Sequence, residues 1–189
     1  MAKKSRKGLW ITIGVIALIL LLFIGSYNGL VNADEETKRA WGNVQTAYQR
    51  RADLIPNLVE TVNAYKIHEQ ELLTEITNAR SGLMNAQTPA QLTQGDSALS
   101  SAIGRLLVVV ENYPNLKANE NFLSLQDELA GTENRVKVER DSYNKAVKKL
   151  NVKTRRFPSN IIANMFGFEG KDAFEAAPGT DVAPKVAFE

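Results

Sequence analysis

Residues 9–27 read LWITIGVIALILLLFIGSY, and the fold depends on this stretch. None of its 19 residues is charged. A helix of that length spans about 28 Å, close to the thickness of a bilayer core. Trp10 and Tyr27 lie near its two ends, where amphipathic aromatic rings favour the membrane interface. We therefore predict one transmembrane helix over residues 9–27, with Trp10 and Tyr27 as membrane-interface residues.

The flanks of this segment predict that it is not cleaved, and they also predict its orientation. A cleaved signal peptide usually has a shorter apolar region, of about 7 to 15 residues, followed by a small-x-small cleavage site. The run here is longer and no A-x-A-like site follows it, so we expect an uncleaved anchor. Four basic residues occur in the short N-terminus, residues 1–8, and three acidic ones at 34–36. The positive-inside rule then predicts a cytoplasmic N-terminus and a periplasmic or extracellular C-terminal domain.

Composition excludes several classes of function. The formal net charge is +2, but removing the four N-terminal charges from 23 basic residues leaves 19 against 21 acidic ones. Nucleic-acid binding needs clustered Lys and Arg on the folded domain, so we expect no nucleic-acid partner. Cysteine is absent, which excludes disulfides, thiolate nucleophiles and Cys-ligated metals.

Beyond the span, apolar residues recur at spacings of three and four, as in amphipathic helices. No proline occurs before Pro56, so the anchor helix can continue into the domain as a stalk. Proline disfavours helical geometry in the residue before it, which predicts a kink or tight turn at residues 50–56. A second helix should follow and end near residues 82–87.

A third helix should begin at Thr88, with Pro89 at its first position and Gln91 placed to complete a capping box. Residues 95–97, Gly-Asp-Ser, could interrupt or restart it. We expect Pro114 to end this helix.

A fourth helix should start near residues 119–120 and run for about 35 residues to a basic end before Pro158. The predicted fold is therefore all-α: the transmembrane helix is followed, over residues 28–157, by an elongated antiparallel bundle of about four long helices. Residues 158–175 form an amphipathic C-terminal segment. Residues 176–189, rich in Ala, Pro and Gly, form a flexible tail.

Two sequence blocks carry a family resemblance. Arg-Arg-x-Asp-Leu-Ile-Pro-Asn-Leu occupies residues 50–58 and Asn-Tyr-Pro-x-Leu occupies residues 112–116. With Phe-Pro-Ser-Asn at residues 157–160, they make nearly the whole chain resemble the LemA family. The resemblance implies a single-pass protein of the bacterial cytoplasmic (inner) membrane with a helical-bundle domain. It also implies envelope or membrane-remodelling roles, including magnetosome formation.

Catalytic and metal-binding patterns are not recognisable. His68 is the one histidine, whereas a di-iron centre in a helical bundle needs Glu-x-x-His on two helices. Leu72 stands where a zinc-protease motif starting at His68 needs its second histidine. We expect an exposed or structural role for His68, no cofactor, no metal and no enzymatic activity.

Two groups of residues are candidates for binding a partner. Arg50 and Arg51 could recognise a carboxylate or phosphate, because guanidinium groups bind such groups bidentately. The alternative is local pairing with Asp53 and helix capping. The second group is an apolar cluster after the basic end of the fourth helix, which would either pack on the bundle or bind a partner or the membrane surface: Phe157, Ile161, Ile162, Met165, Phe166 and Phe168.

The leading functional hypothesis is a membrane-anchored, non-enzymatic envelope scaffold or adaptor. We expect it to contact the lipid bilayer through the anchor helix, to form a homo-oligomer and to hold envelope proteins whose identity the sequence does not give. One alternative is a ligand or peptide sensor that uses Arg50 and Arg51. Another is a membrane-remodelling protein that acts through oligomerisation.

Overall fold

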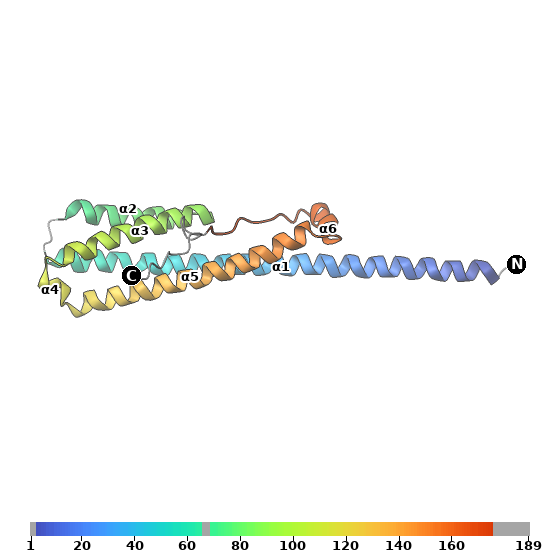
Figure 1. Ribbon diagram of the computed structural model, residues 1–189, viewed down its shortest axis with the longest axis horizontal. Helices are drawn as coiled ribbons and strands as arrows, with labels where there is room; N and C mark the ends of the chain where they lie inside the picture. Colours follow the sequence, from blue (N-terminus) through green and yellow to red (C-terminus); the bar gives the residue numbers. More distant parts are fainter. Residues whose placement is uncertain (1–2, 66–68, 176–189) are drawn as a thin grey trace, which may run out of the picture. The chain divides into compact units, whose positions relative to one another are not determined.

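The structure is a computed structural model that describes residues 3–65 and 69–175. Over these ranges the chain is helical with no strand, so the all-α prediction is confirmed. His68 and the predicted flexible tail, residues 176–189, lie outside the described residues. The described helices, labelled in Figure 1, are α1 (Lys3–Ala64), α2 (Gln70–Met84), α3 (Pro89–Val110), α4 (Pro114–Lys117), α5 (Glu120–Arg155) and α6 (Ser159–Phe166).

The described chain divides into two compact units. The first unit combines residues 3–44 with residues 141–172, and the second combines residues 45–140 with residues 173–175. Helices α1 and α5 each contribute to both units, whereas α2, α3 and α4 belong to the second and α6 to the first.

The N-terminal part of α1 fits a membrane anchor. It holds an 18-residue window with a mean hydropathy of 2.6, and none of that window is buried. Trp10, at 73% exposure, is among its exposed side chains. Burial begins beyond the predicted span, at Leu30 and Ala33 of the first unit. The predicted transmembrane helix therefore lies within α1.

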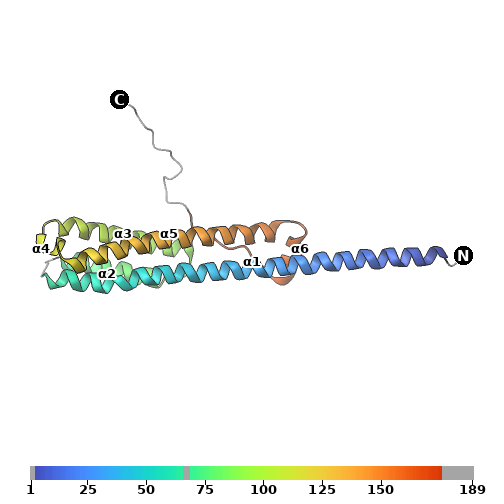
Figure 2. The same cartoon turned by 90° about the horizontal axis from the view of Figure 1, so that it is seen from below.

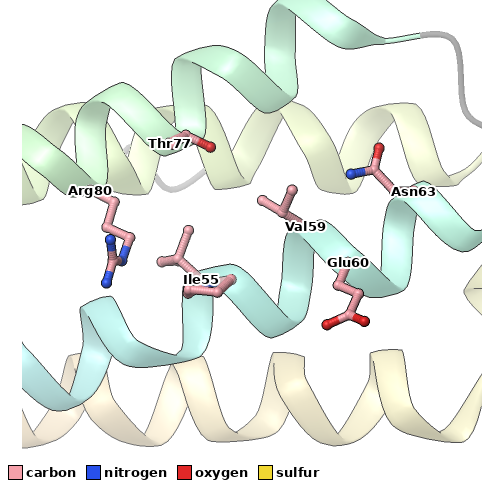
Figure 3. Close-up of a pocket in the computed structure, with 7 residues that line it drawn as sticks. Ile55, Val59, Glu60, Asn63, Thr77 and Arg80 are labelled. Carbon is pink, nitrogen blue, oxygen red and sulfur yellow. The ribbon is translucent and has the colours of Figure 1, made fainter.

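Helix α1 passes through Pro56 without ending, so the tight turn predicted as one alternative at residues 50–56 is wrong. Proline has no N–H, which leaves the carbonyl of Ala52 without its helical hydrogen bond. Nε of Arg80, in α2, donates to that carbonyl at 2.8 Å. Figure 3 shows Arg80 reaching from α2 towards α1 near Ile55. A side chain thus supplies the donor that the proline lacks.

The first break in the helices lies later than predicted. Helix α1 ends at Ala64 and α2 begins at Gln70. Helix α2 ends at Met84, within the predicted region.

Helix α3 begins as predicted but is not interrupted. The backbone N–H of Gln91 donates to Oγ1 of Thr88 at 3.2 Å, and Oε1 of Gln91 accepts from the backbone N–H of Gln87 at 2.9 Å. The predicted interruption at residues 95–97 is wrong. A Cβ at Gly95 would lie 2.9 Å from Cα of Leu83, so glycine permits the close packing of α2 on α3 that Figure 1 shows.

The remaining helices have identifiable ends. Pro114 follows α3 and opens the short helix α4. Oδ1 of Asn119 accepts a hydrogen bond from the backbone N–H of Phe122 at 3.0 Å, which caps the start of α5 where the sequence predicted it. Helix α5 has 36 residues. Gly167 ends α6 with a φ of 71°, a left-handed conformation that glycine adopts easily.

The chain after α6 has no regular structure up to residue 175, yet it is held in place. In the first unit, Nδ2 of Asn151 donates to the carbonyl of Lys171 at 2.9 Å, and its Oδ1 accepts from the backbone N–H of Lys171 at 2.9 Å. In the second unit, Phe174 is buried and the guanidinium of Arg140 lies 4.6 Å from the centre of its ring. The amphipathic segment predicted over residues 158–175 is therefore helical only as far as Phe166.

The bridge across the proline leads to a double-mutant prediction. Arg80→Ala leaves the carbonyl of Ala52 without a donor and should lower the free energy of unfolding by about 1–3 kcal/mol. In a Pro56→Ala background the helix supplies its own N–H to the carbonyl of Ala52. There, Arg80→Ala should lower the free energy of unfolding by about half as much or less. Urea unfolding of the four detergent-solubilised proteins, followed by circular dichroism, measures both costs. Equal costs in the two backgrounds would contradict the role given to Arg80.

Candidate functional site

Arg51 lies inside the second unit and not on its surface. In α1 it follows the buried Tyr48 by three residues and precedes the buried Ile55 by four, so all three share one face of the helix. Arg51 is 2% exposed. Arg50, the neighbouring residue, is exposed.

The guanidinium of Arg51 meets side chains from two other helices. Its Nη2 donates to Oγ of Ser100 in α3 at 2.9 Å and to Oε2 of Glu133 in α5 at 3.4 Å. Its Nε lies 3.5 Å from Oδ1 of Asp96 in α3, a distance for ion-pair attraction with no hydrogen bond formed. Nη1 has no hydrogen-bond partner among the residues that the structure describes. We call Arg51, Asp96, Ser100 and Glu133 the Arg51 cluster.

Burial controls the electrostatics of this cluster. Loss of water raises the pKa of Asp96, and Arg51 and Arg140 oppose that rise only in part. Burial also raises the pKa of Tyr48 to about 12, with the negative charge of Asp96 adding to the effect. Within the cluster, Arg51 and Asp96 hold opposite charges at low exposure, whereas Glu133 is exposed. Removing one partner of such a buried pair costs much stability, because the other charge is left without compensation.

The predicted pairing around Arg50 and Arg51 needs correction. Oδ1 of Asp53 accepts a hydrogen bond from Nε2 of Gln49 at 2.7 Å, whereas Arg51 pairs with Asp96, so the local Arg–Asp53 pairing is wrong. One arginine is exposed and the other is buried, so the structure does not bring the two guanidinium groups to one surface. Sequence reasoning did not identify Asp96 and Glu133 as partners of Arg51.

A shallow hollow of about 360 Å³ lies between α1 and α2 in the second unit. Figure 3 shows Arg80 at one end of it and Glu60 and Asn63 at the other, with Val59 and Thr77 between them. Because Nε of Arg80 is already bonded to the carbonyl of Ala52, we assign the hollow to the packing around Pro56.

A second group of candidate residues lies in the first unit, where α6 packs on α1 (Figure 2). Ile162 and Ala163 are buried against Leu30 of α1. Phe23, Tyr27 and Phe168 are partly buried against the same cluster. Since Tyr27 ends the predicted span, α6 lies beside the point where α1 leaves the apolar segment.

Aromatic contacts fix this position of α6. The ring centre of Phe166 lies 4.9 Å from that of Tyr27 and 6.0 Å from that of Phe23, in edge-to-face arrangements. Phe168 makes a further edge contact with Tyr27 at 6.0 Å. Each such pair contributes about 0.5–1.5 kcal/mol beyond the area it buries. The docking of α6 onto α1 is therefore specific.

The predicted C-terminal cluster divides between two faces of α6. Ile162 and Phe168 face α1, whereas Phe157, Ile161 and Met165 are 75%, 53% and 65% exposed. Ile161 and Met165 are four residues apart and so share one side of α6, and Phe157 lies in the turn that precedes the helix. We call these three residues the outer face of α6. Phe166 is 49% exposed while still touching α1.

Polar contacts tie the end of α5 to the same place. Nζ of Lys153 donates to the carbonyl of Gly29 at 2.9 Å. Oγ of Ser159 donates to the carbonyls of Lys153, at 2.6 Å, and Arg156, at 2.8 Å. Sequence reasoning missed Lys153 and Ser159, although the basic residues before Pro158 marked the region.

Comparisons with known proteins agree on one family. The family model described as LemA family matches residues 40–188. Protein LemA of Metamycoplasma hominis is 28% identical over 166 residues, covering 86% of this chain and 74% of the relative. Magnetosome protein MamQ 2 of Paramagnetospirillum magneticum is 25% identical over 195 residues, covering 89% and 71%. Magnetosome protein MamQ of Magnetospirillum gryphiswaldense is 22% identical over 209 residues, covering 94% and 77%.

Burial predicts different effects at the two neighbouring arginines. Arg51→Ala leaves Asp96 buried without its partner, so we expect the free energy of unfolding to fall by about 3–5 kcal/mol. Arg50→Ala is the matched control, and removing this exposed arginine should change stability by no more than about 0.5 kcal/mol. Urea unfolding of the two variants in detergent measures the contrast. Similar costs for the two variants would contradict the buried role of Arg51.

The raised pKa of Asp96 predicts a pH dependence. Between its ordinary value of 3.8 and its higher value in the folded protein, the folded state binds more protons than the unfolded state. Stability therefore falls as pH rises through that window. Asp96→Asn removes this titration, so the variant should gain stability relative to the native protein as pH rises above 3.8.

Urea unfolding of both proteins at each pH measures this difference. The hydrogen bond from Lys149 lowers the pKa of Glu36, which gives the opposite trend, but Glu36 titrates in both proteins and its effect cancels. A variant whose stability relative to the native protein falls or stays constant as pH rises would contradict the raised pKa of Asp96.

Proposed function

This chain belongs to the LemA family, and from that premise we propose that it is a membrane-anchored, non-enzymatic scaffold or adaptor of the bacterial envelope that self-associates. The observation that carries the proposal is the continuity of α1 from Lys3 to Ala64. Leu30 and Val44 of this helix are buried in the first unit, and Ile55 and Leu58 are buried in the second. One helix therefore contains the anchor and also contributes core residues to each unit.

This arrangement supports a role in holding other molecules at the membrane. A domain joined to its anchor by a long flexible linker can move freely over the bilayer. Here no loop separates the apolar segment from the residues of α1 that build the cores. The names of the family and of its relatives, LemA and MamQ, are not the names of enzymes, which supports a non-catalytic role.

The finer architecture is part of the proposal. We infer an antiparallel helical bundle, supported in the second unit by Arg51, which links α1 to α3 and α5, and by Arg80, which links α2 to α1. The basic residues at positions 1–8 support a cytoplasmic N-terminus. The C-terminal domain would then lie in the periplasm or outside the cell, beyond the cytoplasmic membrane.

Membrane remodelling is the second candidate function. Two of the relatives are named as magnetosome proteins. The position of α6 beside the apolar segment of α1 gives this candidate a structural basis, because remodelling requires protein surfaces that act on the bilayer. No comparable observation favours the ligand or peptide sensor, since Arg51 is already bound to Ser100 and Glu133.

Self-association has a direct test. We expect the detergent-solubilised full-length protein to elute in size-exclusion chromatography as one discrete species. Light scattering corrected for detergent should give it a protein mass of at least twice 20.9 kDa. A dilution series serves as the control, because a specific oligomer shifts towards the monomer only as the concentration falls. A mass of 20.9 kDa at every concentration would contradict self-association.

A further inference from the structure

We propose that the outer face of α6 is a lipid-binding surface that inserts into the leaflet where α1 leaves the bilayer. The inference depends on the anchor but not on self-association. Its residues, Phe157, Ile161 and Met165, are apolar and exposed. The chain from Phe157 to Phe168 contains no charged residue. Three large exposed apolar side chains within residues 157–165, with no charge among them, are unusual on a surface that faces water.

The contacts of α6 place it at the depth of the membrane interface. Phe166 touches both Tyr27, at the end of the predicted span, and Phe23. Phe23 precedes Tyr27 by four residues, which is roughly 6 Å along a helix. Helices that lie in the interface bury their apolar face by roughly 5–10 Å. The depth at which Phe166 contacts α1 therefore agrees with an interfacial helix.

Basic residues lie on the water side of the aromatic contacts, as they do at a bilayer surface. Lys153 contacts the carbonyl of Gly29, two residues beyond Tyr27 and so on the water side of it. Arg155 and Arg156, next in the chain, are exposed. Cations at this level can bind the phosphates of anionic lipids, while the aromatic rings lie deeper. The aromatic and basic side chains are thus arranged as at a membrane surface.

The position of the outer face favours lipid over a protein partner. On α1, Leu21 and Ile24 of the predicted span are 68% and 53% exposed, as residues in contact with acyl chains must be. Phe23, between them in the chain, contacts Phe166 of α6. Helix α6 is therefore held against the predicted span, next to side chains that we expect to contact lipid.

The absence of cysteine from the chain allows single labelled positions to test this proposal. Ile161→Cys and Met165→Cys would each carry an environment-sensitive nitrobenzoxadiazole label on the full-length protein in nanodiscs of phosphatidylcholine and phosphatidylglycerol. Val138→Cys, at 60% exposure in α5, is the matched control for water, and Leu18→Cys, at 58% exposure in the span, is the control for lipid. An unchanged helical circular dichroism signal confirms folding of each variant.

Two quenchers then separate the possible environments. Lipids with a nitroxide close to the headgroup should quench the labels at positions 161 and 165 at least about three-fold more strongly than the label at position 138. Iodide in the solution should quench the label at position 138 more strongly than the labels at positions 161 and 165. Quenching by iodide as strong as at position 138 would overturn the proposal. Protection from both quenchers would also overturn it, because a protein partner or a second copy would then cover the outer face.

Discussion

The structure depends on the continuity of α1 as one helix from Lys3 to Ala64. In the apolar segment a helix satisfies its own N–H and C=O groups, which is a condition for crossing lipid. At Pro56 the helix lacks one donor, and Arg80 provides it from α2 at 2.8 Å. This single side-chain contact also fixes where α2 lies along α1 in the second unit. At this position, one hydrogen bond therefore serves both the packing of α2 on α1 and the continuity of α1.

In the Arg51 cluster, a buried charge also connects α1 to other helices of the second unit. A buried ion pair adds little net stability, because removing two charges from water costs about as much as their attraction returns. Such a pair can instead specify which helices meet and in which register. Arg51 reaches Asp96 and Ser100 on α3 and Glu133 on α5, so one residue of α1 selects positions on two other helices. We interpret the Arg-Arg-x-Asp-Leu-Ile-Pro block as structural, with Arg51 and Pro56 each requiring a partner from elsewhere in the chain.

Local signals predicted some features of this protein, and tertiary contacts determined the others. The apolar run at residues 9–27, the cap at Thr88 and the start of α5 at Asn119 depend on nearby residues and were predicted. The passage through Pro56 depends on a donor, Arg80, that lies 28 residues after the Ala52 carbonyl, and the local pattern does not contain it. Arg51 and Asp96 occupy apolar-stripe positions, three residues after Tyr48 and four after Leu92, so their low side-chain exposure could have been inferred. Their partners could not, and neither could the division of the C-terminal cluster into inner and outer faces, because both depend on which helices meet.

Membership of the LemA family and the continuous helix that contains the apolar segment support the proposed non-catalytic role at the membrane. The central claim is that α1 continues through Pro56 as one helix. Amide hydrogen exchange of the full-length protein in nanodiscs, followed by mass spectrometry, tests it most directly, because each protected amide reports an intact hydrogen bond. We predict slow exchange of the available amides throughout residues 45–62, including those on both sides of Pro56. Fast exchange confined to residues 53–58 would show a break or turn at the proline and would contradict the claim.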